Sequence, residues 1–531
     1  MFKLKNTLKR SAASVALLAG LMTPVAGMAD EVTLRSTDGT INVTGELVEV
    51  KDGSYIIRTA LGELGIAQSR VVCEGAACPS FEPEAVDVAI VGSEAIGLRL
   101  MPLLMAGYAS LQDAEAEVKN VSAGQAVATM IGDGGFGDEL GSYSVSAVGD
   151  SNAFSALLSQ DAALGMSTRR ITVEEARALR ADGSESMVGQ SQERIIAVDS
   201  MLVVTNASNP VDVLTTQQIG DIFSGKITNW SELGGEDAQI NVLNYKEGSS
   251  NYDFFMSYLY DNNIPEQASA ETAANDQEMS NEVFADPHAI GYVGYAFQRG
   301  AKPITLVNEC GIPMTPDAFA AKTEEYALSR RMYMYNRGND LDEQAKSFLE
   351  FATSEDADGV ILKSGFIDLG IESRPQNEGD QRRATLLEFV KSQGDSFEGQ
   401  VVQEMLEMME NSERLSTTIR FRAGSSRIDE RGREDMKRLV RYLQTVPKGS
   451  EVTFVGFTDD VGAFEANREL SGERAQQIAD EVASLGGTSL SAIKFASAGF
   501  GEIAPNACNV NARGQAINRR VEVWISTPNG V

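Results

Sequence analysis

The stretch LTTQQIGDIFSGKITNW, residues 214–230, marks the beginning and the end of one helix. Thr215 followed by Gln218 has the spacing of a capping box, in which two side chains satisfy backbone N–H groups of the first turn. The helix is expected to end at Ser224 and Gly225, because glycine readily adopts the left-handed conformation that closes helices. Trp230 is expected to pack against the domain. The stretch therefore predicts local architecture and no ligand contact.

On both sides of this stretch, from about residue 87, apolar strand-like runs alternate with helical segments. Residues 86–91 run into Gly92 and Ser93, and a helical segment follows through Tyr108. Thr172 with Glu175 predicts another capped helix. This alternation predicts an α/β domain with mainly parallel strands over residues 81–375. Ligands of such domains bind beyond the carboxyl ends of the strands, where loops meet helix N-termini.

The first part of the chain has a different pattern. Residues 1–29 carry four basic residues within the first ten positions, continue with a short apolar run, and end with the small residues Gly27 and Ala29. This is typical of a secretory signal peptide cleaved before Asp30. Short alternating apolar runs separated by Asp-Gly turns then predict a small β domain over residues 30–80. Its role is left open.

Charge and size restrict the possible functions. The formal net charge is −31, and it becomes −35 without residues 1–29, which carry four positive charges and no negative ones. A strongly acidic chain is a poor binder of nucleic acid or anionic lipid, so no nucleic acid partner is expected. A mature chain of about 500 residues is too long for one core, so several domains are expected.

The cysteines and the histidine argue against metal and hydrolase chemistry. Cys73 and Cys78 are close enough in sequence to close one loop by a disulfide. Cys310 and Cys508 either form a second, long-range bridge or remain isolated thiols. With a single histidine, His288, we expect no zinc site, no cofactor and no catalytic triad. The chain is therefore expected to be a binding protein and not an enzyme.

The C-terminal part starts with a helical linker over residues 376–415, interrupted near Gly394 and Gly399. A final domain over residues 416–531 shows helical periodicity around Leu439 and Ile478. Strand-like runs at 452–456, 493–498 and 521–525 separate and follow these helices. The expected order is β-α-β-α-β.

Several spaced motifs of this final domain resemble the OmpA-like peptidoglycan-binding domain. They are GFTD (456–459), Asn467, LS (470–471), RA (474–475), GFGE (499–502), Pro505, Gly514 and NRRVE (518–522). The resemblance implies that Asp459 and Arg474 bind the ammonium and the carboxylate of diaminopimelate in the peptidoglycan stem peptide, since a guanidinium bonds a carboxylate bidentately. Asn467 and Thr458 would orient the loop or add hydrogen bonds. Arg519 and Arg520 are expected to be structural.

The central domain resembles the phosphate-binding periplasmic proteins, which have the type II substrate-binding fold of two lobes. The resemblance rests on residues 197–235, including the stretch quoted first, on GMSTR (165–169) and on AIGY (289–292). It implies an anion site built from loop hydroxyls, backbone N–H groups and helix N-termini. By position the site residues are Ser93, Ser151, Asn152, Thr168, Ser249, Ser250 and Asn251.

The sequence departs from the family pattern at these loops. Ser249-Ser250-Asn251 replaces the usual Ser-Gly-Thr, and Tyr245, beside Lys246, replaces an arginine. Glu94 adjoins Ser93, and Thr168 offers a hydroxyl where family members can place an aspartate. Three functions stay open: binding of phosphate through altered contacts, binding of another small anion or polar solute, or a structural role without ligand.

Together these observations predict a periplasmic solute-binding protein anchored to the cell wall. The expected fold class is an α/β multidomain chain, with a small N-terminal β domain, a two-lobed binding domain and an OmpA-like βαβαβ domain. The protein would lie in the periplasm, bound to peptidoglycan and in reach of the outer membrane. The expected partners are peptidoglycan, a small anion such as phosphate, and an inner-membrane transporter or sensor. The alternative is an envelope linker whose binding domain has lost its ligand.

Overall fold

The computed structural model forms two compact units, residues 1–81 and 82–531. It describes residues 31–36, 42–51, 54–60, 62–67, 71–75, 77–78, 86–132, 138–247, 249–261, 271–338, 341–377, 381–393, 396–421, 428 and 430–528. The predicted signal peptide lies outside these residues. Among the described residues, every helix is too short or too polar to cross a membrane.

The first unit is an antiparallel sheet in the order β4-β3-β2-β1-β5. Its strands are β1 (Glu31–Ser36), β2 (Asn42–Lys51), β3 (Ser54–Thr59), β4 (Gly62–Ala67) and β5 (Val71–Glu74). Alternate residues point to one face, where Leu34 and Ile57 are fully buried. The predicted Cys73–Cys78 disulfide is present beside this core. The prediction of a small β fold is confirmed.

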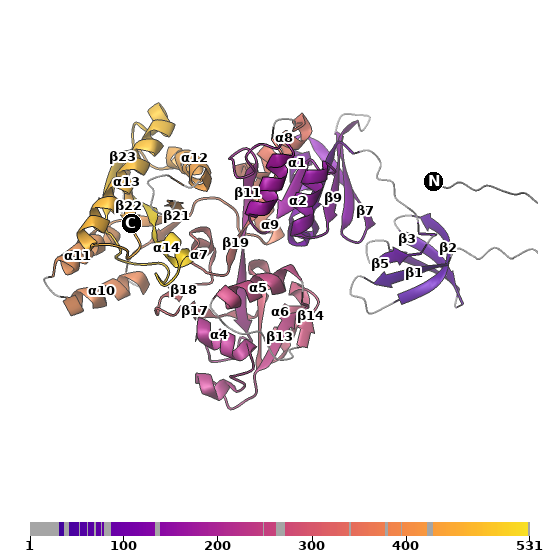
Figure 1. Ribbon diagram of the computed structural model, residues 1–531, viewed down its shortest axis with the longest axis horizontal. Helices are drawn as coiled ribbons and strands as arrows, with labels where there is room; N and C mark the ends of the chain where they lie inside the picture. Colours follow the sequence, from indigo (N-terminus) through magenta and orange to yellow (C-terminus); the bar gives the residue numbers. More distant parts are fainter. Residues whose placement is uncertain are drawn as a thin grey trace, which may run out of the picture. The chain divides into compact units, whose positions relative to one another are not determined.

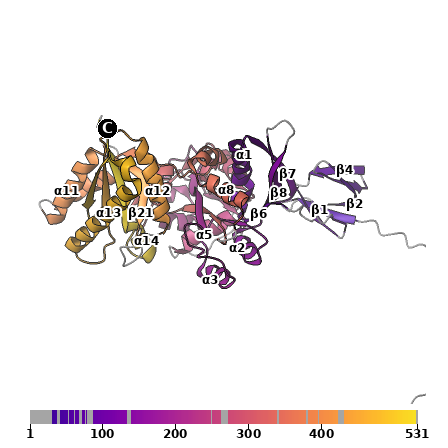
Figure 2. The ribbon, with the colours of Figure 1, turned by 90° about the horizontal axis from the view of Figure 1, so that it is seen from above.

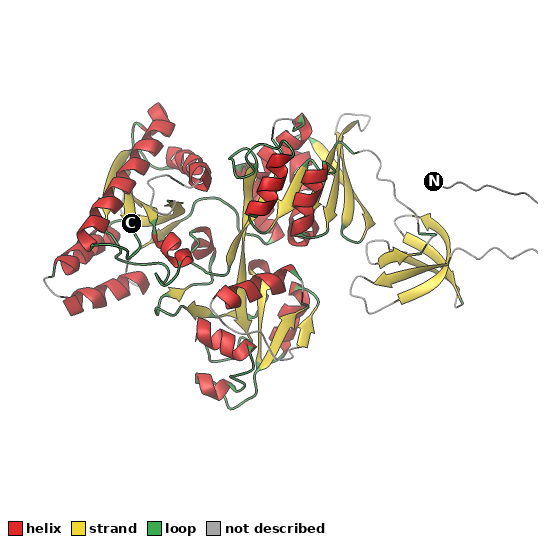
Figure 3. Cartoon of the chain, viewed as in Figure 1, coloured by secondary structure: helices red, strands yellow, loops and turns green. Residues whose placement is uncertain are grey.

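The second unit begins with a two-lobed α/β region (Figure 1, Figure 3). Lobe 1 starts with β6 (Val88–Gly92), η2 (Ile96–Leu100), α1 (Met101–Leu111), β7 (Ala114–Ser122), β8 (Gln125–Gly132), β9 (Glu139–Ala147), α2 (Asp150–Ser159), β10 (Leu164–Ser167) and α3 (Val173–Ala181). The chain returns to it with β19 (Ser329–Tyr335), α8 (Glu343–Ala352), η5 (Glu355–Ala357) and α9 (Asp358–Ser364). Its core lies between β6, α1 and α8.

Lobe 2 is inserted between these two halves of lobe 1. It contains β12 (Val213–Thr215), α4 (Thr216–Phe223), η3 (Trp230–Leu233), β13 (Asn241–Tyr245), α5 (Ser250–Asp261), β14 (Glu271–Ala273), α6 (Asp276–Ala285), β15 (Ala289–Gly294), η4 (Tyr295–Phe297), β16 (Lys302–Pro303), β17 (Thr305–Val307), β18 (Pro313–Met314) and α7 (Ala318–Lys322). The predicted capping box of Thr215 and Gln218 is present at α4, and Trp230 is buried in the lobe core.

The strand β11 (Glu193–Thr205) joins the two lobes. Its first half pairs with β19 in lobe 1, and its second half pairs with β15 in lobe 2. The sheet order β14-β13-β15-β11-β19-β10-β6-β9-β8-β7 therefore runs through both lobes. The change of partner falls between Ser200 and Met201, which makes this part of β11 the hinge.

The prediction of mainly parallel strands is only partly correct. The strands β10, β6 and β9 are parallel, as are β14, β13 and β15. However, β11 and β19 run antiparallel to each other, and the hairpin β7–β8 adds two antiparallel strands at the edge. Both departures arise because the chain crosses between lobes twice and extends lobe 1 with a hairpin.

The C-terminal domain is a sheet covered by helices on both faces (Figure 1, Figure 2). Its elements are β20 (Ser373–Pro375), α10 (Gln381–Gln393), α11 (Phe397–Glu410), β21 (Glu413–Arg420), α12 (Glu430–Thr445), β22 (Glu451–Phe457), α13 (Phe464–Gly486), η6 (Gly487–Leu490), β23 (Lys494–Gly499), α14 (Ala512–Asn518) and β24 (Arg520–Ser526). The expected β-α-β-α-β order is present from β21 to β23, but the short helix α14, which was not expected, lies between β23 and β24. Helices α12 and α13 pack on one face of the sheet and α10 and α11 on the other.

This domain is fastened to lobe 2 by covalent and ionic contacts. Cys310 and Cys508 form a disulfide, which confirms the long-range pairing and excludes the two isolated thiols. Glu324 accepts hydrogen bonds from Arg420 of β21 at 2.8 Å and from Arg331 of β19 at 2.7 Å. The strand beside the hinge is therefore linked directly to the C-terminal domain.

Candidate functional site

Three neighbouring loops of lobe 1 meet at the carboxyl ends of β6, β9 and β10. The N–H of Ser93 donates to the carbonyl of Met166 at 2.8 Å, and the N–H of Gly149 donates to the carbonyl of Gly92 at 2.9 Å. Gly92 has a φ of +143°, and a Cβ there would lie 2.0 Å from the Met166 oxygen. Only glycine allows this close approach of loops.

The side chain of Thr168 contacts a carboxylate. Its N–H donates to Asp150 Oδ1 and its hydroxyl to Asp150 Oδ2, both at 2.7 Å. Asp150 is the first residue of α2, where the helix dipole favours a negative charge. The carboxylate that the sequence lacks at Thr168 is therefore supplied from the neighbouring loop. Asp150 was not among the predicted site residues.

The other predicted residues of lobe 1 differ in exposure. Ser93 is 1% exposed, and its hydroxyl accepts a long hydrogen bond from the N–H of Ile96, which places it at the start of a helix. Ser151 and Asn152 are exposed, and the Asn152 amide donates to the carbonyl of Val148. Glu94 is exposed as well. Of this group, Ser151 is the hydroxyl best placed to meet a solute.

On lobe 2, the predicted residues gather at the N-terminus of α5. Ser249 Oγ accepts from the N–H of Tyr252 at 3.3 Å. Ser250 Oγ and Asn251 Oδ1 accept from the guanidinium of Arg330 at 3.2 and 3.1 Å. Arg330 lies on β19, the strand that pairs with the first half of β11 beside the hinge. The structure thus brings a guanidinium of β19 to the start of α5.

A buried aspartate on the facing hinge strand holds this guanidinium. Asp199 Oδ2 accepts from Nε and Nη2 of Arg330 at 3.1 and 2.9 Å, and both side chains are less than a tenth exposed. Such a fork fixes the plane of the guanidinium. Its remaining nitrogen, Nη1, bonds Ser250, so Arg330 connects the hinge to the α5 loop.

A second aspartate, Asp276, is partly buried and connects the two lobes. Its Oδ1 accepts from the hydroxyl of Tyr245 at 2.7 Å and from the Asn251 amide at 3.2 Å. Its Oδ2 is 3.4 Å from Nη1 of Arg99, which comes from η2 of lobe 1. Burial and the Asp276 charge raise the pKa of Tyr245 well above its usual value, so the phenol stays protonated and donates. Tyr245 therefore replaces an arginine by a neutral donor.

Taken together, the loops hold hydroxyls, two helix N-termini and Arg330, and also the carboxylates of Asp150 and Asp276. Such a mixture suits a small polar solute that both accepts and donates hydrogen bonds. Sequence reasoning missed Asp150, Asp199, Asp276, Arg99 and Arg330. The available signal was weak: Asp150 directly precedes the predicted Ser151.

In the C-terminal domain the predicted residues lie around the end of β22. Asp459 Oδ2 accepts from Nη1 of Arg519 at 2.6 Å. Arg474 is 4% exposed on α13, and its guanidinium lies 5.1 Å from the ring of Phe421. Burial, then the charge of Arg519, lowers the pKa of Arg474, while Asp459 opposes this change. Asp459, Arg474 and Arg519 are thus one electrostatic cluster, and the expectation of a purely structural Arg519 is incomplete.

Asn467 and Thr458 shape this cluster. The Asn467 amide donates to the Asp459 carbonyl at 3.4 Å and to Glu502 at 3.0 Å. The N–H of Thr458 donates to the carbonyl of Gly501 at 2.8 Å. Its buried hydroxyl has no hydrogen-bond partner among the described residues. The loop bearing Asp459 is therefore held by Asn467 on one side and by the hydrogen bond between Thr458 and Gly501 on the other. The hydroxyl of Thr458 stays available for a further hydrogen bond.

The two halves of the second unit match two protein families. Residues 104–356 match the model of the PBP superfamily domain, and residues 420–519 match that of the OmpA family. The first match lies in the two-lobed region and the second in the C-terminal domain.

Curated relatives match part of the chain. The chain is 30% identical over 174 residues to the phosphate-binding protein PstS of Bacillus subtilis, covering 32% of this chain and 56% of the relative. For PstS of Borreliella burgdorferi the identity is 22% over 186 residues, or 34% of this chain and 66% of the relative. The chain thus spans about half to two thirds of these relatives. They are named as binding proteins and not enzymes, as expected here.

Among solved structures, an ABC-type phosphate transport receptor from Vibrio cholerae is 23% identical, with a TM-score of 0.40, covering 53% of this chain and 99% of that one. The C-terminal domain of Helicobacter pylori MotB is 29% identical, with a TM-score of 0.18, covering 21% of this chain and 84% of that one.

Proposed function

We propose that this chain is a periplasmic binding protein for phosphate or a related small oxyanion, anchored to peptidoglycan by its OmpA domain. The observation that carries the proposal is the disulfide between Cys310 and Cys508, which fixes a PBP superfamily domain to an OmpA domain within one compact unit. Disulfides persist in oxidising compartments, and the periplasm is one of them. The PstS names of the relatives support phosphate as the solute.

In this proposal the oxyanion binds between the α2 and α5 N-termini. Ser151, Ser249 and the backbone N–H groups of both helices would donate to it. Arg330 would supply the positive charge, and Asp150 would accept a proton from a protonated oxyanion. The bound protein would then serve a membrane transporter or sensor, with the wall raising its local concentration.

The first test is isothermal titration of the full chain with phosphate, after non-reducing unfolding and refolding to remove carried-over ligand. Saturable binding in the micromolar range or tighter is expected. Arg330→Gln should weaken it by about 10- to 100-fold, because a charge-assisted hydrogen bond contributes roughly 1.5–3 kcal/mol. Arg180→Gln, on the exposed face of α3, makes the same charge change and should leave binding unaltered. A folded chain that gives no heat with phosphate would refute phosphate as the solute and favour the envelope linker.

The second test concerns the wall. The full chain should pellet with purified sacculi that contain diaminopimelate. Asp459→Ala and Arg474→Ala should each abolish pelleting, because each leaves one charge of diaminopimelate without its partner. Asp480→Ala, at an exposed position further along α13, is the control and should pellet normally. Pelleting of both site variants would show that another surface holds the wall.

A further inference from the structure

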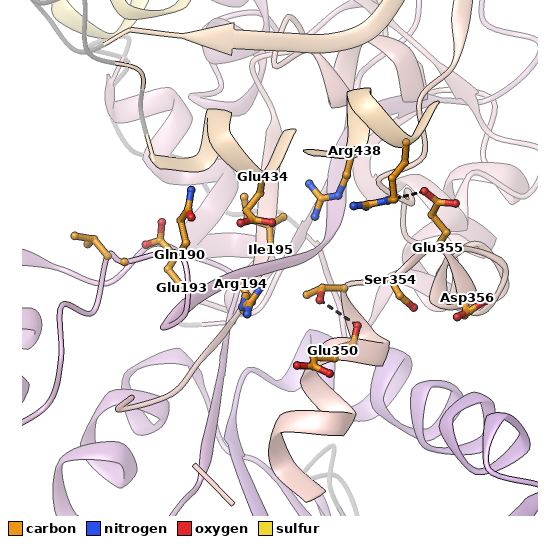
Figure 4. A pocket seen from close by; sticks show the side chains of 14 residues that line it. Gln190, Glu193, Arg194, Ile195, Glu350, Ser354, Glu355, Asp356, Glu434 and Arg438 are labelled. Atoms are coloured by element: carbon orange, nitrogen blue, oxygen red, sulfur yellow. Dashed lines mark hydrogen bonds and ion pairs between the residues drawn. The ribbon is translucent and has the colours of Figure 1, made fainter. Parts of the chain in front are cut away.

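A cavity of about 480 Å³ lies where lobe 1 meets α12 of the C-terminal domain (Figure 4). Its walls come from the turn before β11 and the start of that strand, from the end of α8 with η5, and from α12. It is separate from the candidate anion site, because its β11 residues end at Ile195, before Asp199 and the hinge. Neither candidate site described above uses these residues.

The inner wall of this junction cavity presents hydrogen-bond donors. Nε of Arg194 and Nε2 of Gln190 are buried and have no acceptor among the described residues. Arg438 of α12 also lines the cavity, with one nitrogen 3.1 Å from Asp435. Burial lowers the pKa of Arg438. Buried donors without acceptors are unfavourable, so this wall calls for an anionic group from outside the chain.

The rim carries the opposite charge. Glu350, Glu355 and Asp356 line the cavity and are exposed. Glu355 accepts from Arg441 at 2.9 Å, while Glu350 and Asp356 form no ion pair with any other described residue (Figure 4). Glu193 and Glu434 also line the cavity, so its lining mixes guanidinium groups with carboxylates. Such a lining suits a ligand that carries an ammonium group beside its anionic group.

A smaller, more apolar cavity of about 200 Å³ adjoins the first. The two share Ser354, Arg438 and Arg441 among their lining residues. The apolar wall of the smaller one is formed by Ile196, Ile361, Leu369, Ile371 and Tyr442. An apolar side chain of the same ligand would fit here, out of water.

We propose that the junction cavity binds a small zwitterion with an apolar side chain, an amino acid or a short peptide with free termini. Its carboxylate would accept from Arg194, Gln190 and Arg438. Its ammonium would face Glu350 and Asp356, and its side chain would enter the smaller cavity. Inorganic phosphate lacks both the ammonium and the apolar part. Because the ligand contacts lobe 1 and α12 together, its binding also stabilises the junction of the two domains.

The test is isothermal titration of the full chain with L-alanyl-L-alanine and D-alanyl-D-alanine. Saturable binding of at least one is expected. Tighter binding of the D form would indicate a wall-derived ligand, and tighter binding of the L form a peptide solute. N-acetylated and C-amidated versions of the same dipeptide should bind at least about 10-fold more weakly, because each lacks one charge.

Variants separate this site from the other two. Arg194→Gln should weaken dipeptide binding by about 10- to 100-fold, and the exposed control Arg180→Gln should not. Arg330→Gln and Asp459→Ala should leave dipeptide affinity unchanged, so failure of the phosphate or wall proposal would not affect this result. Near-ultraviolet circular dichroism checks that each variant is folded. Absence of dipeptide binding, equal affinity for capped dipeptides, or an unaffected Arg194→Gln variant would each overturn the proposal.

Discussion

At the scale of single residues, the most demanding feature is a fully buried carboxylate. Glu522 of β24 lies 2.7 Å from Nε of Arg520 and 3.0 Å from nitrogens of both Arg382 and Arg414. It also accepts from the indole of Trp524 at 3.0 Å. Burial opposes its ionisation, but the three arginines outweigh burial and hold the pKa of Glu522 well below its ordinary value. The carboxylate therefore balances a cluster of buried positive charge.

Glu522→Gln should destabilise the second compact unit by about 3–5 kcal/mol, because it leaves buried guanidinium groups without their counter-charge. Urea unfolding followed by tryptophan fluorescence measures this. The exposed pair of Lys391 and Glu388 provides the control, and Glu388→Gln should cost less than about 1 kcal/mol. Because the folded pKa of Glu522 is depressed, its contribution should be complete at neutral pH and be lost as the pH falls below about 4. Equal losses for the two variants would contradict this account.

At the scale of residues, a family motif allowed positions to be named from the sequence, whereas partners that lie far apart in the sequence were missed. Asp459 and Arg474 could be named from their order in the motif, although their role is still a prediction. Arg519 meets Asp459 from 60 residues away, and Arg330 meets Asp199 from 131 residues away. Such pairs arise from strand register, which local sequence patterns do not contain.

At the scale of elements, helix α13 packs with its backbone against the strands β22 and β23. A Cβ on Gly456 would lie 1.9 Å from the backbone oxygen of Ser471, and one on Gly499 would lie 2.3 Å from the nitrogen of Gly472. The two glycines are paired across β22 and β23. Helix and sheet therefore touch through backbone, and this contact sets the position of α13 with Asn467 and Arg474.

Gly456→Ala should displace α13 from the sheet, since backbone atoms cannot move aside as side chains do. We expect a loss of roughly 1–3 kcal/mol in stability and reduced pelleting with sacculi. Gly359→Ala in α9 is the control, because nothing lies within 4 Å of its added Cβ. That variant should be neutral or more stable by up to about 1 kcal/mol. If the Gly456→Ala variant has the same stability as the parent chain and pellets equally well with sacculi, the packing argument fails.

Elements with explicit end signals were predictable, and elements without them were not. The capping boxes at Thr172 and Thr215 are confirmed, as are the strands and the interrupted linker helices of the C-terminal part. The hairpin of β7 and β8 was missed. Most of β7 is exposed or half-buried and carries Glu115, Glu117 and Lys119, so it lacks the apolar alternation that marks a half-buried strand.

At the scale of the whole second unit, the C-terminal domain contacts both lobes on either side of the hinge. On lobe 2 it is joined through Cys310 and through Glu325, which bonds Arg414 and Asn506. On lobe 1 it is joined through Glu355 and Arg441. In β19, Arg330 faces the candidate site at the start of α5, and the next residue, Arg331, faces Glu324 and Asp435. Movement at the hinge is therefore expected to be transmitted to the C-terminal domain.

The disulfide between Cys310 and Cys508 should be the strongest of these attachments, because it closes a segment of 198 residues. Replacing both cysteines by serine removes that constraint from the unfolded chain, with a typical loss of 2–4 kcal/mol. We expect the melting temperature of the second unit, measured by calorimetry without reductant, to fall by several degrees. The Cys73→Ser/Cys78→Ser variant is the matched control, since that disulfide spans five residues of the first unit. Pelleting with sacculi should persist in both variants, because β20 still pairs with β21 and the ion pairs remain. A second-unit transition that shifts equally in the two variants would mean that the ionic contacts alone hold the domains together.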